Sequence, residues 1–189
     1  MTTVTPRPID PMSDAQLELI VGARRGVLVT IGPDGLPRPV PFCYVAQAEE
    51  PGSLVLHSPI DEKPKRTDDS LGLARVRDIA RRPDVVVLVD RWAEDWTQLA
   101  WVRLKGTAIV LPQGDTDTAD ERTDAVAALR AKYPQYATHA LEERPIIRIE
   151  IDSWSGWSTS PAVSAAGSAP SPSAGGSGSW PSPGDSRRR

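Results

Sequence analysis

Lys63, Lys65 and Arg66 form a compact cationic loop, although the whole chain contains only four lysines. The sequence places this loop between a predicted strand and a predicted helix that begins near Thr67 or Ser70. Ammonium groups bind phosphate as point charges, and free N–H groups at a helix start add dipoles of the same sign. The segment therefore predicts an anion site. The alternative is a solvated loop whose charge is offset by Asp61, Glu62, Asp68 and Asp69.

Tryptophans are concentrated in a second segment of the chain. Trp92, Trp96 and Trp101 lie within ten residues, although only 5% of the residues are aromatic. Packing in a core accounts for one or two of them. A third, on a loop beside a polar strand face, favours a platform for a planar ring system.

Other site chemistries find little support in the sequence. No glycine-rich loop runs from a strand into a helix, and the two histidines have no matching cysteines, so we expect no metal site. A Ser-His-Asp triad meets only in space and is not excluded by sequence. Even so, His57 beside Ser58 on a strand is more typical of a packed residue than of a catalytic base.

Charge and composition restrict the partners and the compartment. A net charge of −3 argues against nucleic acid as a partner. The single cysteine excludes an intrachain disulfide, as expected in a reducing cytosol. No stretch approaches the roughly 20 apolar residues that span a bilayer. We therefore expect a cytoplasmic protein without a membrane segment.

Hydrophobic periodicity predicts a mainly β fold. Six strands are expected at residues 26–32, 36–46, 53–58, 84–90, 98–111 and 144–152. Helices are expected after a capping box at Ser13, over 70–82 and over 116–133, with a shorter helical piece near 136–143. Pro37, Pro39 and Pro41 alternate along the second strand, which predicts an edge strand or an irregular strand with one face open. Short turns between most strands favour a closed or partly closed barrel with flanking helices.

Composition divides the chain into three parts. Residues 1–12 form a proline-rich flexible lead, and residues 13–159 form the predicted cofactor-binding domain. From residue 160 to 189 serine, proline, glycine and alanine dominate. Such a segment buries too little surface to offset its ordering entropy, so it is predicted to be a disordered tail.

Four blocks of the sequence, in this order and spacing, resemble a known family. They are TIGPDGLPRPVPFCYV, VLHSPIDEKPKRT, IARRPDVVVLVD and EDWTQLAWVRLKGTAIVL. They are similar to blocks of the flavin-binding split β-barrel family related to pyridoxamine phosphate oxidases, in particular its branch of coenzyme F420-dependent oxidoreductases. The resemblance covers about residues 15–157. It implies a six-stranded split barrel that pairs into a homodimer, with the cofactor in a groove at the interface.

The resemblance also implies roles for individual residues. Lys63, Pro64 and Lys65 match the loop that binds the cofactor phosphate, and Ser58 matches a hydroxyl residue that helps to hold it. On the strand that lies along the tricyclic ring, the matching residues are Arg38, Val40 and Pro41. An aromatic residue at the pocket rim is matched by Trp96.

These implications predict an oxidoreductase that transfers hydride between coenzyme F420 and a small organic acceptor. The cofactor carries the chemistry, so no catalytic side chain is assigned. One alternative is an FMN-dependent oxidase or reductase of the same fold. Another is a non-catalytic binder of a flavin, deazaflavin or tetrapyrrole, because fold alone does not establish turnover.

Overall fold

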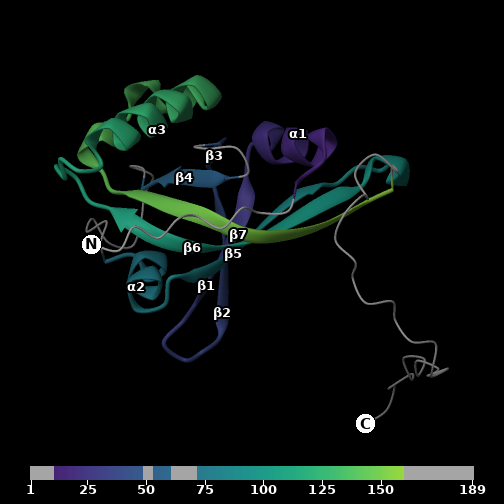
Figure 1. Cartoon of the computed structure of the whole chain (residues 1–189), viewed down its shortest axis with the longest axis horizontal. Coiled ribbons are helices and arrows are strands. Elements are labelled where there is room, and N and C mark those ends of the chain that lie inside the picture. Colours follow the sequence, from purple (N-terminus) through teal and green to yellow (C-terminus); the bar gives the residue numbers. More distant parts are fainter. Residues whose placement is uncertain (1–10, 49–52, 61–71, 160–189) are drawn as a thin grey trace, which may run out of the picture.

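The computed structural model describes residues 11–48, 53–60 and 72–159 (Figure 1). The strands are β1 (Gly26–Ile31), β2 (Pro37–Phe42), β3 (Val45–Gln47), β4 (Val55–Pro59), β5 (Asp84–Arg91), β6 (Ala100–Leu111) and β7 (Ile146–Ser158). The helices are α1 (Asp14–Gly22), α2 (Ala74–Arg81) and α3 (Ala119–Lys132), with 3-10 turns η1 (Trp96–Gln98), η2 (Pro134–Thr138) and η3 (Leu141–Glu143). The predicted cationic loop and the predicted tail lie outside the described residues.

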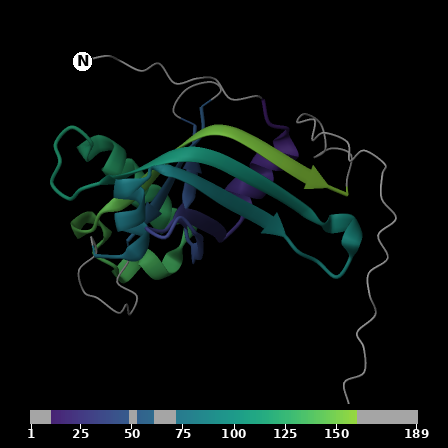
Figure 2. The same cartoon turned by 90° about the horizontal axis from the view of Figure 1, so that it is seen from below.

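The mainly β prediction is confirmed. All seven strands join one antiparallel sheet in the order β2-β1-β5-β6-β7-β4-β3. In Figures 1 and 2 α2 and α3 lie at the same end of the sheet, and the long β5, β6 and β7 extend away from them. Burial alternates along β6, where every second residue from Ala100 to Ala108 is buried, whereas all five residues of β4 are buried.

The sheet has seven strands rather than the predicted six, because the expected strand at 36–46 is interrupted at Tyr44. The Tyr44 N–H donates to the Tyr133 hydroxyl at 3.0 Å, and this hydroxyl donates to the Tyr44 carbonyl at 2.7 Å. Both backbone groups of Tyr44 are therefore satisfied by one side chain instead of by a neighbouring strand. The chain leaves β2 at this residue and begins β3.

Buried phenols hold this break in place. Tyr44 is completely buried, and its hydroxyl donates to the Ile20 carbonyl at 2.6 Å. Burial raises the pKa of both Tyr44 and Tyr133, so both hydroxyls remain protonated donors. The Lys132 ammonium lies 4.5 Å from the centre of the Tyr44 ring. Burial and the nearby Arg24 charge lower the pKa of Lys132 to about 8.

The interruption at Tyr44 has a consequence for the whole sheet. β2 and β3 are the two outermost strands in the pairing order, yet only Cys43 and Tyr44 separate them in sequence. Three Cα–Cα steps span at most about 11 Å. The two edges must therefore approach each other here, so the sheet curls at this end. No hydrogen-bonded pairing between β2 and β3 closes it within the described residues, and barrel closure stays a prediction.

The helices mostly follow the sequence pattern. The capping box is confirmed: the Ser13 N–H donates to the Gln16 side chain at 2.8 Å, and the Gln16 N–H donates to the Ser13 hydroxyl. α3 contributes Val126 and Leu129 to a second apolar cluster, which also contains Tyr133 and Ile146. The predicted helical piece at 136–143 is two short 3-10 turns. None of the described helices is long and apolar enough to cross a bilayer.

The link between Tyr44 and Tyr133 predicts a measurable loss of stability. Tyr133→Phe removes both hydrogen bonds and leaves a buried N–H and a buried carbonyl without partners, which costs about 1–3 kcal/mol. Tyr44→Phe removes only the bond to Ile20 and should cost less. Urea unfolding followed by far-UV circular dichroism measures both variants. A Tyr133→Phe protein as stable as wild type would contradict the role given to this hydroxyl.

Candidate functional site

A groove of about 550 Å³ opens between β2 and the first turns of α2. This volume is within the range of about 300–1,000 Å³ that small-molecule sites occupy. The groove is lined by Thr30, Arg38, Pro39 and Val40 from the β1–β2 hairpin, by Gly72 and Leu73 before α2, and by Ala74, Arg75, Arg77 and Asp78 of α2. Three guanidinium groups therefore border a partly apolar cavity.

The sequence of β2 explains why Arg38 lies in this groove. Successive side chains of a strand point to opposite faces, and in β2 the half-buried positions are Arg38 and Val40. The alternate positions, Pro37, Pro39 and Pro41, are exposed. Proline lacks an N–H group, and among the described strands β2 pairs only with β1, so the predicted edge position is confirmed.

α2 begins later than predicted and forms the other wall of the groove. It starts at Ala74, because Leu73 has an extended backbone and acts as an N-cap without a side-chain hydrogen bond. Burial of Val76 and Ile79 in the core, rather than a polar cap, fixes the helix in place. Arg77 lies on the exposed face of the helix.

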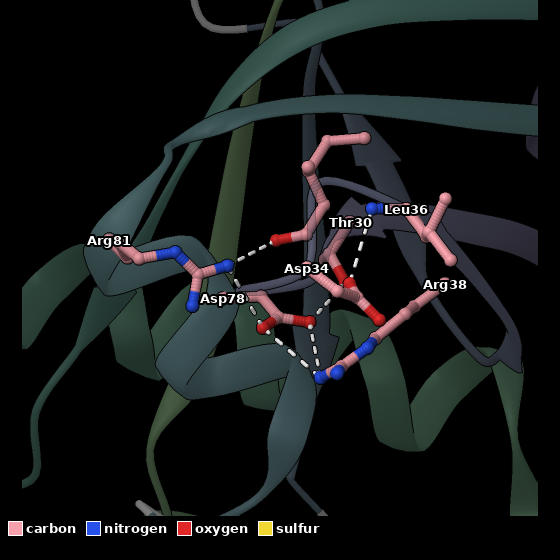
Figure 3. A network of polar contacts seen from close by, with 7 residues as sticks. Thr30, Asp34, Leu36, Arg38, Asp78 and Arg81 are labelled. Atoms are coloured by element: carbon pink, nitrogen blue, oxygen red, sulfur yellow. Dashed lines mark hydrogen bonds and ion pairs between the residues drawn. The ribbon is translucent and has the colours of Figure 1, made fainter.

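A buried carboxylate joins the two walls (Figure 3). The Asp78 side chain is 2% exposed and accepts a hydrogen bond from the Thr30 hydroxyl at 3.0 Å. Arg38 Nη1 lies 3.4 and 3.5 Å from its two oxygens, and Arg81 Nη2 lies 3.4 Å from Oδ1. Arg81 also donates to the Ile31 carbonyl, which ties α2 to the end of β1.

The charges around the groove favour a negatively charged ligand. Three arginines and one carboxylate line the groove, so its lining keeps a net positive charge. The Arg38 side chain is 40% exposed, and within the described residues Asp78 is its only hydrogen-bond partner. Most of its five N–H donors therefore stay available to an anionic ligand.

The structure unites some of the predicted site residues and separates others. Arg38 and Val40 share the groove, whereas Pro41 lies on the opposite, exposed face of β2. Ser58 is buried in β4 and does not line this groove. Trp96 is 70% exposed in η1, at the tip of the β5–β6 hairpin, far along the sheet from α2 in Figures 1 and 2.

The predicted phosphate loop, Lys63, Pro64, Lys65 and Arg66, lies outside the described residues. Its segment ends directly before Gly72, and Gly72 lines the groove. The roles of these four residues stay predictions.

His57 has a structural environment, as expected. It is 1% exposed, and its Nε2 lies 2.7 Å from Glu121 Oε1. The same oxygen accepts a hydrogen bond from Arg148 Nε at 2.8 Å. Among the described residues no group of histidine, cysteine and carboxylate side chains could hold a metal ion.

A second, more apolar groove of about 760 Å³ follows the outer face of the sheet. Two of the three clustered tryptophans, Trp92 and Trp101, line it together with Trp157 and Leu88. Leu88 and Trp157 are 36% and 43% exposed, which is unusual for large apolar side chains gathered in one place.

Sequence reasoning missed Asp78 and its partner Thr30. A possible signal was present: Asp78 is the sole acidic residue of α2, in the run ARVRDIAR. Its position beside Ile79, an apolar core residue, indicates a carboxylate on the buried side of the helix. Its partners, however, come from a hairpin about 40 residues earlier.

Comparisons with known proteins agree with this fold. The family model for pyridoxamine 5'-phosphate oxidase matches residues 12–158. A conserved hypothetical protein from Mycobacterium tuberculosis is 19% identical, with a TM-score of 0.56 over 82% of this chain and 91% of that one. An FAD-binding protein from Mesorhizobium loti is 21% identical, with a TM-score of 0.54 over 75% of this chain and 91% of that one.

An F420 reductase is 18% identical over 73% of this chain and 94% of that one. Its TM-score is 0.48. No curated protein sequence matches significantly. Because the family model covers most of the sequence, the chain belongs to the pyridoxamine 5'-phosphate oxidase family.

Proposed function

We propose that this protein is an oxidoreductase that binds coenzyme F420 between β2 and α2 and transfers hydride between the coenzyme and a small organic acceptor. The observation that carries the proposal is the groove in which Arg38 and Val40, both predicted cofactor residues, lie opposite a helix start rich in arginine. Membership of the pyridoxamine 5'-phosphate oxidase family supports a redox function.

The residues present fit such a cofactor. Val40, Leu73 and Ala74 offer apolar contact to a planar ring, while Arg38 and Arg77 offer charge-assisted hydrogen bonds to anionic oxygens. When bound, a deazaflavin supplies hydride transfer at its ring. The side chains of the groove bind the cofactor, orient it and exclude water from one side of it.

Charge is the reason for preferring coenzyme F420 to FMN. The coenzyme carries a phosphodiester and a glutamate chain, and thus more negative charge than FMN. The two arginines on the helix side of the groove, Arg75 and Arg77, supplement the predicted cations Lys63 and Lys65. FMN would use the same groove with fewer of these contacts. A non-catalytic binder is the remaining alternative.

Titration of the intrinsic tryptophan fluorescence with coenzyme F420 and with FMN, side by side, tests the choice of cofactor. We expect tighter binding of the deazaflavin, because it offers more anionic groups to the cationic groove. Reduced coenzyme F420 should then be reoxidised faster when a suitable acceptor is added. Tighter binding of FMN would indicate that FMN is the cofactor. Binding without turnover across a panel of acceptors would favour the non-catalytic binder.

Lys63 and Lys65 provide the next test. Lys65→Ala should weaken coenzyme binding by about 1.5–3 kcal/mol, the range for a hydrogen bond to a charged group. The double alanine variant should lose more, although less than the sum, because both cations serve one phosphate. Isothermal titration calorimetry at low and high salt measures the effect, with Lys105→Ala as a control outside the loop. Unchanged affinity in the double variant would leave the loop as a solvated surface feature.

We further propose that the protein is a homodimer that pairs through the apolar groove on the outer face of the sheet. This groove shares no lining residue with the groove between β2 and α2, so the proposal departs from the cofactor site at the interface that the resemblance implies. Leu88, Trp101 and Trp157 give this face an apolar centre. Its border carries both signs of charge, with Asp90 and Arg103 among the lining residues. A two-fold axis requires such a self-complementary surface, since each copy contributes the same patch. Pairing here would bury side chains that a monomer leaves in water.

A charge in this groove should disrupt the dimer. Leu88→Arg places a guanidinium in the apolar centre, and analytical ultracentrifugation should then show a monomer. Leu36→Arg is the matched control, because Leu36 is 62% exposed in the β1–β2 turn and does not line the groove. A wild-type protein that sediments as a stable monomer would contradict the proposal, as would a dimer that tolerates arginine at position 88.

A further inference from the structure

The contact between Asp78 and Arg38 presents an apparent contradiction. A carboxylate beside an anion site repels the ligand, and Asp78 is part of the lining of the groove. A buried carboxylate also loses its hydration, which is costly unless charged or polar partners replace the water. Because Asp78 both repels an anionic ligand and loses its hydration, we expect it to favour ligand binding in some other way.

Thr30, on β1, shows how firmly the carboxylate is fixed. The Thr30 side chain is 1% exposed and donates its hydroxyl hydrogen to Asp78 Oδ2 at 3.0 Å. Asp78 is itself carried by α2, which is anchored in the core through Val76 and Ile79. The carboxylate is therefore held by two elements, and it offers Arg38 a fixed acceptor on the groove wall (Figure 3).

Gly32 leaves room for the Arg38 side chain beside the β1–β2 turn. A Cβ atom at Gly32 would lie 2.6 Å from Arg38 Nε and 2.8 Å from Arg38 Cζ. It would also lie 2.4 Å from Asp34 Oδ1. The guanidinium thus rests directly on the backbone of the β1–β2 turn, in space that any larger residue would occupy. Gly32 leaves this space open, and the Asp78 carboxylate holds the side chain in it.

We propose that Asp78 is a positioning residue that, together with Gly32, holds the Arg38 guanidinium at the groove so that its free N–H groups face the anionic part of the ligand. The inference rests on the proposed function for the identity of that ligand. An arginine has several rotatable bonds, and fixing it before binding reduces the entropy lost on binding. This gain opposes the electrostatic repulsion from Asp78.

The two effects predict opposite results for Asp78→Asn. This change keeps the size of the side chain and an oxygen that can accept from Thr30, but it removes the negative charge. Electrostatics alone predicts tighter binding of an anion. Positioning predicts binding about five- to tenfold weaker, the fold-change that a coupling of about 1–1.4 kcal/mol gives.

The experiment is a double-mutant cycle on the full chain. Binding is measured for wild type, Asp78→Asn, Arg38→Ala and the double variant by calorimetry, with coenzyme F420, FMN and inorganic pyrophosphate as separate probes. The loss caused by Asp78→Asn should fall to no more than about twofold when Arg38 is absent. Equal losses in both backgrounds, or tighter binding by Asp78→Asn, would overturn the inference.

Two further variants keep the result interpretable. Gly32→Ala retains every charge but displaces Arg38, so it should weaken binding to a similar degree, and an unchanged affinity would count against the inference. Arg81→Ala is the matched control, because Arg81 also contacts Asp78 but does not line the groove. It should keep its affinity within about twofold even if its melting temperature falls.

The choice of probes separates this inference from the proposed function. A protein that binds pyrophosphate with the expected coupling, but neither coenzyme F420 nor FMN, would refute the proposed function and support the positioning role. A protein that binds a flavin or deazaflavin with no coupling between Asp78 and Arg38 would do the reverse. Failure to bind any of the three probes would overturn both.

Discussion

The fold depends on a constraint at Tyr44, where the two outermost strands of the sheet are joined by a two-residue connection. One hydroxyl, from Tyr133, satisfies both backbone groups of Tyr44, so the chain can leave one edge and enter the other without unpaired polar groups. The sheet has to curl to meet this connection. The curl leaves β2 as an edge strand beside α2, and the candidate groove lies between them.

The chemistry of the groove depends on a buried charge, the Asp78 carboxylate. Asp78 is nearly inaccessible to water, and its oxygens contact a threonine and two arginines. Such a cluster is more valuable for specifying geometry than for stability, because desolvation offsets much of the Coulomb attraction. On the opposite face of the same sheet, exposed Leu88 and Trp157 give the apolar surface through which we propose that two subunits pair. One curled sheet thus offers a cationic groove and an apolar face.

The local sequence pattern was sufficient to predict much of the secondary structure. Alternating burial, the edge position of β2 and the capping box were all predicted, because each depends on residues close together in sequence. The break at Tyr44 was missed, since its partner Tyr133 is 89 residues away. Asp78 was missed for the same reason, because Thr30 and Arg38 belong to another hairpin. Resemblance predicted Arg38 as a site residue, but only the fold revealed what holds it.

A crystal structure of the protein with coenzyme F420 tests most directly whether the groove between β2 and α2 binds the cofactor. We expect the ring along the face of β2 that carries Arg38 and Val40, with the anionic tail directed toward the start of α2. Coenzyme bound elsewhere, for example in the tryptophan-lined groove and without contact to Arg38, would contradict it.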